Sequence, residues 1–144
     1  MKKILKNIIL LYLLLFLPFE LNVVLAETKT NVVTWRMLRK LHSISHIPHK
    51  LKSLDKKKVR LRGFMVPLEG NKDEVIEFLL VPVSGMCIHL PPPPANQSVY
   101  VTVKKGNKIS HSFEAVRVTG ILTIKSVDSE YGAAYYSIKA DQVF

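Results

Sequence analysis

Cysteine is nearly absent from this chain, since Cys87 is the single cysteine among 144 residues. No disulfide can form within one chain, so a hydrophobic core must stabilise the fold, and a chain of this length can bury one. Acidic residues are also scarce, with 11 Asp and Glu against 21 Lys and Arg and a formal net charge of +10. No internal repeat is present, and the low-complexity sequence is limited to a proline run. The length is that of a single domain.

The N-terminal segment has the pattern of an export signal. Residues 1–6 carry three lysines, Ile8–Phe19 is apolar, and Val24–Ala26 offers residues tolerated at a cleavage site before Glu27. The apolar stretch is interrupted short of the ~20 residues that span a bilayer, which disfavours an uncleaved anchor. We therefore expect residues 1–26 to be a signal peptide and the mature protein to be periplasmic in a Gram-negative bacterium.

Positive charge is concentrated near the start of the mature chain. Eleven basic residues and one acid lie between Lys29 and Arg62, whereas seven basic and eight acidic residues follow. An exported protein rarely meets nucleic acid, so such a segment would contact anionic lipid headgroups or an acidic protein surface. The alternative is a solvated basic face without a partner. The candidate contact residues of this basic arm are Arg36, Arg39, Lys40, Lys56, Lys57, Lys58 and Arg60.

A short helix is expected in residues 27–50, the part of the basic arm that precedes the β domain. Thr34 can cap a helix that runs through about His42, with Trp35, Leu38 and Leu41 on one face, and we expect this helix to pack against the β domain that follows. Residues 43–49 then read as a linker, because proline disfavours continuation of the helix.

Residues 51–144 read as a β domain. Alternating or continuous apolar runs with β-branched residues predict about five strands: residues 59–66, 75–82, 98–103, 113–124 and 134–140. Gly63 suggests a bulge or sharp bend, Gly120 suggests a bend, and residues 127–132 read as a loop. The strand number and lengths fit a small antiparallel barrel of the OB type, with a compact β-sandwich as the alternative.

A thiol and an imidazole stand close together before the proline run. Cys87 and His89 are two apart, so in an extended segment both side chains point to the same side and can reach one zinc or copper ion. Two ligands are too few for zinc, and His111 is the best candidate for a third. His42, His46 and His49 form a weaker signal. The alternative is that Cys87 packs in the core as a small apolar residue.

The loop that follows is stiffened by proline, which fixes φ and lacks a backbone donor. It could close one end of the barrel, with its polar side chains bonded to the turn backbone, or present a preformed surface to another protein. The candidate binding residues are Pro91, Pro92, Pro93, Pro94, Asn96 and Gln97.

Three segments together resemble one known family. Residues 61–69, 77–82 and 87–97, the last with its Cys-Ile-His and proline run, are similar to the DUF3299 family of exported bacterial proteins, and the resemblance covers roughly residues 50–144. It implies a small periplasmic β-barrel domain, and some members accompany ABC-type transporters linked to zinc.

Two functions are therefore expected as alternatives. The first is a periplasmic accessory protein that handles zinc or copper with an ABC-type transporter component. The second is a non-catalytic interaction module of the cell envelope that binds an envelope protein partner or the anionic membrane. No enzyme is expected, because a thiol enzyme needs a third orienting group and an oxyanion site that this sequence does not demonstrably place.

Overall fold

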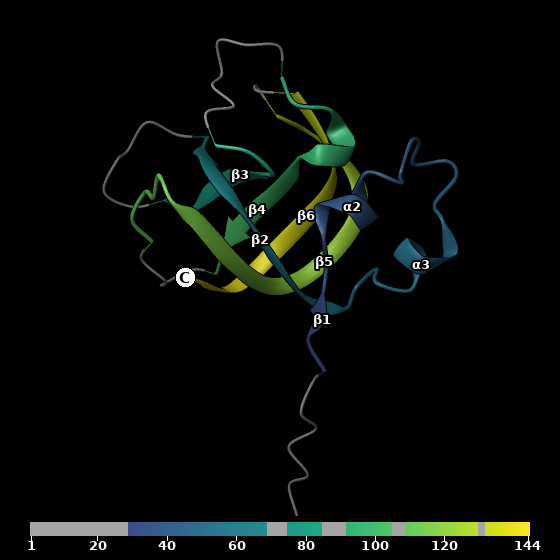
Figure 1. The fold of residues 1–144 in the computed structure, drawn as a ribbon, viewed down its shortest axis with the longest axis horizontal. Coiled ribbons are helices and arrows are strands. Elements are labelled where there is room, and N and C mark those ends of the chain that lie inside the picture. Colours follow the sequence, from purple (N-terminus) through teal and green to yellow (C-terminus); the bar gives the residue numbers. More distant parts are fainter. Residues whose placement is uncertain (1–28, 69–74, 85–91, 105–108, 130–131) are drawn as a thin grey trace, which may run out of the picture.

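The computed structural model describes residues 29–68, 75–84, 92–104, 109–129 and 132–144 of the chain (Figure 1). Within these ranges the protein is mainly β, as predicted, with a few short helical elements. In chain order the elements are β1 (Asn31–Val32), α2 (Trp35–Leu38), α3 (His49–Lys52), β2 (Lys58–Pro67), β3 (Glu77–Val81), η1 (Ala95–Gln97), β4 (Val99–Val103), β5 (Ala115–Ser129) and β6 (Gly132–Val143).

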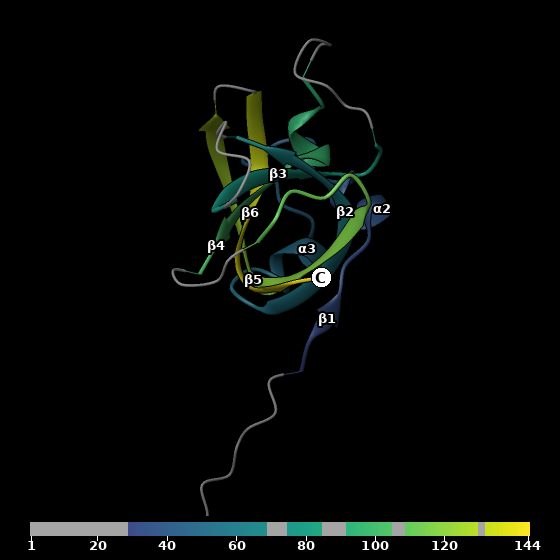
Figure 2. The same cartoon turned by 90° about the vertical axis from the view of Figure 1, so that its left-hand side faces the viewer.

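The strands form one sheet whose two ends meet. The order is β1-β2-β3-β4-β6-β5, and β5 pairs back onto β2, so β2 to β6 make a closed ring around a common interior (Figures 1 and 2). The ring accounts for the five predicted strands, and it is not a pair of separate stacked sheets. The prediction of a purely antiparallel arrangement is wrong, because β4 and β6 pair in parallel. A parallel pair needs a long crossover, and β5 supplies it here.

Two strands show how the sequence pattern sets burial. In β2, Val59 and Leu61 face the core while Arg60 and Arg62 are exposed, which confirms the predicted period of two. β3 is buried on both faces, as its continuous apolar run predicted. One face of β3 joins the main core, and the other joins a second apolar cluster.

Glycine is required at two positions where a neighbouring backbone comes too close for a side chain. A register shift lies between Thr119 and Gly120, where the sequence predicted a bend, and a Cβ at Gly120 would clash with the carbonyl oxygen of Lys139. At Gly63 the pairing of β2 with β5 continues without a shift. A Cβ there would lie 2.6 Å from the carbonyl oxygen of Val81 and 2.9 Å from Cζ2 of Trp35, so Gly63 allows both β3 and the indole to approach β2 closely.

The N-terminal helix is shorter than predicted. α2 ends at Leu38 instead of near His42, and the amide of Leu41 bonds to the carbonyl of Leu38 in the tighter i to i−3 pattern. The side chain of Thr34 makes no capping hydrogen bond. The segment read as a linker ends in α3, since Pro48 stands at the N-cap, where a missing N–H costs nothing.

The hairpin between β5 and β6 is longer than predicted. Val127 pairs with Ala134 and Ser129 with Gly132, so residues 127–129 extend β5 where a loop was expected. Gly132 has a φ of 115°, which a side-chain-bearing residue would adopt only with strain. The polar residues of the segment 127–132 suggested a loop, but a polar residue such as Asp128 is exposed here within a strand.

A single main core joins the N-terminal segment to the ring. Val33, Leu38 and Leu41 are buried in the same cluster as Phe78 of β3 and Tyr136 of β6. The segment that the sequence assigned to a basic arm therefore contributes apolar side chains to the core. No helix in the described part of the chain is long and apolar enough to cross a membrane.

Candidate functional site

The predicted metal-binding loop falls largely outside the described residues. Cys87, His89 and Pro91 lie in that part of the chain, so their arrangement is not tested. His111 is described, and its ring packs edge-on against Phe113, with ring centroids 4.4 Å apart at 85°. No cluster of three or more His, Cys, Asp or Glu within the described ranges is arranged to hold a metal ion.

The other three histidines are surface residues. Nδ1 of His42 lies 3.0 Å from the carbonyl oxygen of Lys40, and His46 is exposed in the following turn. His49 begins α3 and is also exposed. α2 ends before His42, so His42 and His46 do not share a helical face.

The described end of the proline loop is tied to the body of the protein. Pro92, Pro93 and Pro94 lead into η1, where the amide of Gln97 donates to the carbonyl of Pro94 at 2.7 Å. Nδ2 of Asn96 donates to the carbonyl oxygen of Arg39 at 3.1 Å, not to its own turn. η1 thereby lies beside the turn after α2 at one end of the ring (Figure 1). The loop end has a clear structural role.

The predicted basic residues occupy three places. Arg36, Arg39 and Lys40 lie on α2 and the turn after it, and Lys56 and Lys57 lie in the turn before β2. Lys58 and Arg60 belong to β2 itself. All are exposed except the half-buried Lys58, whose Nζ lies 3.2 Å from Oδ2 of Asp141.

Strand pairing places basic residues of β5 and β6 beside those of β2. Arg62 pairs with Arg117 of β5, and Lys58 pairs with Ile121, which in turn pairs with Lys139 of β6. Directly paired residues point to the same side of a sheet. The outer side therefore carries five cations, which we call the basic face: Lys58, Arg60, Arg62, Arg117 and Lys139.

Sequence reasoning missed Arg117 and Lys139 as members of this face. Their exposure could have been read from the alternation, since Arg117 stands between Val116 and Val118. Their position beside Arg62 and Lys58 depends on the register of strands far apart in the chain. That register is not visible in a charge count, which described the second half of the chain as near neutral.

The arginines of the basic face lack a counter-ion among the residues that the structure describes. Within the described ranges, no ion pair joins Arg60, Arg62 or Arg117 to an acidic side chain. Directly opposed like charges destabilise a sheet. The Arg62–Arg117 pairing therefore contributes less to the stability of the sheet than a pair of opposite charges would, and a bound external anion would offset the repulsion.

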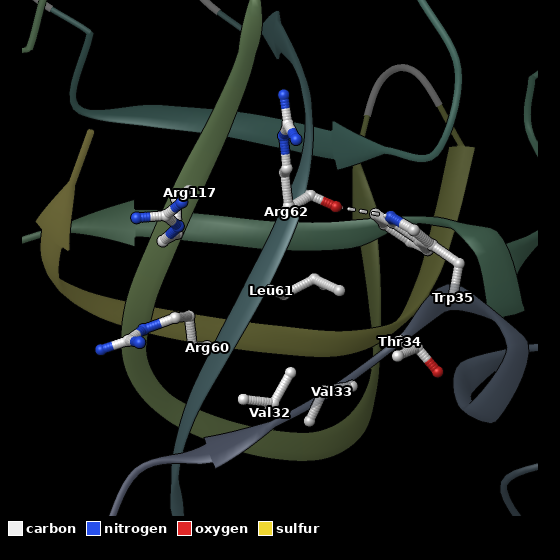
Figure 3. A pocket seen from close by; sticks show the side chains of 8 residues that line it. All are labelled: Val32, Val33, Thr34, Trp35, Arg60, Leu61, Arg62 and Arg117. Carbon is white, nitrogen blue, oxygen red and sulfur yellow. Dashed lines mark hydrogen bonds between the residues drawn. The ribbon is translucent and has the colours of Figure 1, made fainter.

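A pocket of about 310 Å³ adjoins this face (Figure 3). Arg60 and Arg117 extend to one side of β2, and Trp35 lies on the other. The indole Nε1 donates to the carbonyl oxygen of Arg62 at 2.7 Å, which fixes the ring as one wall. The lining residues are Val32, Val33, Thr34, Trp35, Arg60, Leu61, Arg62 and Arg117. Apolar walls beside guanidinium groups suit a ligand that joins an anionic group to an apolar one.

The chain belongs to the DUF3299 family, described as a protein of unknown function, because residues 21–144 match that family. A crystal structure of a DUF3299 family protein from Pseudomonas aeruginosa PAO1 is similar, with 32% sequence identity and a TM-score of 0.64 over 80% of this chain and 95% of that chain. Among curated proteins, none matches the chain. The resemblance seen in the sequence is confirmed, and the family assigns no activity.

Proposed function

We propose that this protein is a non-catalytic binding module of the cell envelope that recognises an acidic partner through its basic face. The observation that carries the proposal is the direct cross-strand pairing of Arg62 with Arg117. A purely structural role would favour opposite charges at paired positions, whereas two arginines at paired positions offer an external anion two guanidinium groups on the same side of the sheet.

The expected location agrees with this partner. Residues 1–26 carry the pattern of a signal peptide, and the proposal places the mature protein in the periplasm. Acidic groups there belong to membrane headgroups and envelope proteins, not to nucleic acid. Exposed arginines would attract either over about one Debye length, ~8 Å at physiological ionic strength.

Metal handling is a second proposal that depends on a different segment. Its support is the Cys-x-His spacing of Cys87 and His89, together with the imidazole of His111. It would make the protein a zinc or copper accessory of an ABC-type transporter component. The two proposals are compatible, since the basic face does not include the Cys87 segment.

Arg117→Glu tests the first proposal through two opposite effects. The new carboxylate would stand opposite Arg62, so the free energy of unfolding should rise by about 0.2–1 kcal/mol as a like-charge pair becomes an ion pair. Binding of fluorescent polyglutamate at low salt should fall about tenfold, because the charge of one of the two paired arginines is reversed. Chemical denaturation and fluorescence anisotropy measure the two quantities.

Lys125→Glu is the matched control. Lys125 is exposed on the same strand. It lies eight positions after Arg117, or about 26 Å along an extended strand. Lys125→Glu changes the net charge by the same amount as Arg117→Glu, but it should leave the affinity for polyglutamate within about twofold of the wild-type value. Equal losses of affinity in both variants would show that only net charge matters and would overturn the basic face as a site.

A further inference from the structure

We infer that the acidic partner is the anionic phospholipid surface of a membrane, with one lipid's phosphate on the arginines and its adjoining apolar part in the pocket beside Trp35. This inference rests on the proposed function and adds the class of partner.

Exposed apolar side chains alternate with the cations of the basic face. Val32 pairs with Arg60, and Ile121 pairs with Lys58, and they are 67% and 39% exposed. Phe144 exchanges two backbone hydrogen bonds with Arg117 and is 74% exposed. Each of these cations therefore has an apolar side chain next to it.

This interleaved pattern fits a bilayer better than an acidic protein. A protein interface gathers apolar residues into a buried centre and places charge at the rim. A membrane surface instead offers phosphates and acyl carbons at neighbouring depths over its whole area. Basic residues near such a surface each contribute to affinity, and apolar side chains add to it when they enter the boundary below the headgroups.

The pocket supplies specificity that a flat face lacks. Its volume, about 310 Å³, is at the low end for small-molecule sites, so it suits part of a lipid better than a whole molecule. Arg60, Arg62 and Arg117 lie on its lining, where a guanidinium fork can bind a phosphate with two parallel hydrogen bonds. A phosphate joined to glycerol and an acyl chain would place its charge on the guanidinium groups and its apolar part against the apolar walls.

Trp35 makes the inference directly measurable, because it is the single tryptophan of the chain and lines the pocket. Vesicles of phosphatidylglycerol should shift its emission to shorter wavelength, and phosphatidylglycerol with brominated acyl chains should quench it. Vesicles of phosphatidylcholine should do neither. Inorganic phosphate at millimolar concentration tests the other source of the same anionic group and should leave the emission unchanged. A shift with phosphate alone would assign the site to a free anion and overturn the lipid inference.

The double variant Val32→Ser with Phe144→Ser separates lipid from acidic protein. It keeps every cation, so polyglutamate binding should be unchanged, whereas vesicle affinity should fall about tenfold. Val83→Ser is the control, because Val83 is an exposed apolar residue that belongs neither to the basic face nor to the pocket lining.

The results of these experiments separate the lipid inference from the proposed function. Polyglutamate binding without vesicle binding would leave the proposed function intact and make the partner an acidic protein. Loss of both would overturn the proposed function as well. Equal vesicle affinity of the wild type and the Val32–Phe144 variant would show that charge alone attracts the protein, and the pocket would then have no role.

Discussion

The phenol hydroxyl of Tyr136 donates a hydrogen bond of 2.7 Å to the carbonyl oxygen of Leu38, across 98 residues of sequence. The next carbonyl, that of Arg39, accepts from Asn96 of η1. The last carbonyls of a helix have no partners within it, and α2 is only four residues long. Side chains from β6 and η1 therefore complete its end and hold the N-terminal segment against the ring.

Tyr136→Phe should destabilise the protein by about 0.5–1.5 kcal/mol, because the carbonyl of Leu38 would lose one of its two donors and keep the amide of Leu41, while the ring still fills the core. Guanidinium denaturation, followed through the emission of Trp35, measures the change. Tyr135→Phe is the control, since Tyr135 is only half-buried beside it. An equal and small effect of both variants would contradict a structural role for the Tyr136 hydroxyl.

The buried hydroxyl of Tyr136 also predicts that the stability of the protein depends on pH in the alkaline range. Burial raises the pKa of Tyr136 above its ordinary value of 10.0. The unfolded chain therefore loses this proton at lower pH than the folded protein, and its ionisation stabilises the unfolded state. The stability difference between wild type and Tyr136→Phe should be constant below about pH 9 and shrink above pH ~10. Thermal melts of both proteins across this range would measure the stability difference. A difference that grows with pH would contradict the prediction.

Leu41→Ala should cost about 2–5 kcal/mol, the usual range for a large side chain removed from a core. Leu41 is completely buried, as its place on the apolar face of the N-terminal segment predicted. Lys40→Ala, at the exposed position before it, should change stability by less than about 0.5 kcal/mol. By the same reasoning a chain that begins near Lys50 should not fold cooperatively, and a sharp denaturation transition for it would contradict this account.

The fold could be predicted from the sequence to the extent that local pattern determines it. Val59 and Leu61 alternate with Arg60 and Arg62, and such a period is set by strand geometry alone. The parallel pairing of β4 with β6 could not be predicted, because it depends on which distant strands meet. The end of α2 could not be predicted either, since Tyr136 and Asn96, far along the chain, provide its hydrogen-bond donors.

The site was predicted less completely than the fold. The cluster of basic residues before Arg62 was visible as a count, but the pairing of Arg62 with Arg117 requires strand register. The pocket depends on Gly63, whose missing side chain gives the indole of Trp35 its place. The sequence showed Gly63 as a break in the strand pattern, and only packing shows that it is a point of close approach.

Gly120→Ala should destabilise the protein by about 1–3 kcal/mol, because the added methyl group would overlap the backbone of Lys139 and a backbone cannot move aside as a side chain can. Chemical denaturation measures the loss. Thr123→Ala is the control on the same strand, at a half-buried position. A neutral Gly120→Ala would mean that the register shift between Thr119 and Gly120 can be lost without cost.

Metal binding by Cys87 and His89 predicts a protected thiol. Zinc should slow alkylation of Cys87, a chelator should restore it, and His89→Ala should abolish the protection. Because ligation needs a thiolate and a neutral imidazole, the protection should weaken below about pH 6.5, where protons compete for the histidine. If His111 is the third ligand, His111→Ala should also lower zinc affinity, whereas His46→Ala, at an exposed turn position, should not. Mass spectrometry of the alkylated protein at several pH values measures each effect.

Core packing of Cys87 predicts the opposite pair of results. The thiol would then react slowly with and without chelator, because protection would come from burial and not from a bound ion. Cys87→Ser would lower stability by about 1–3 kcal/mol, since a buried hydroxyl without a partner carries that cost. A metal ligand on a loop predicts little change in stability of the metal-free protein. Metal-independent protection together with a lower melting temperature of Cys87→Ser would overturn the metal proposal, and it would leave the basic face as the one functional site proposed for this protein.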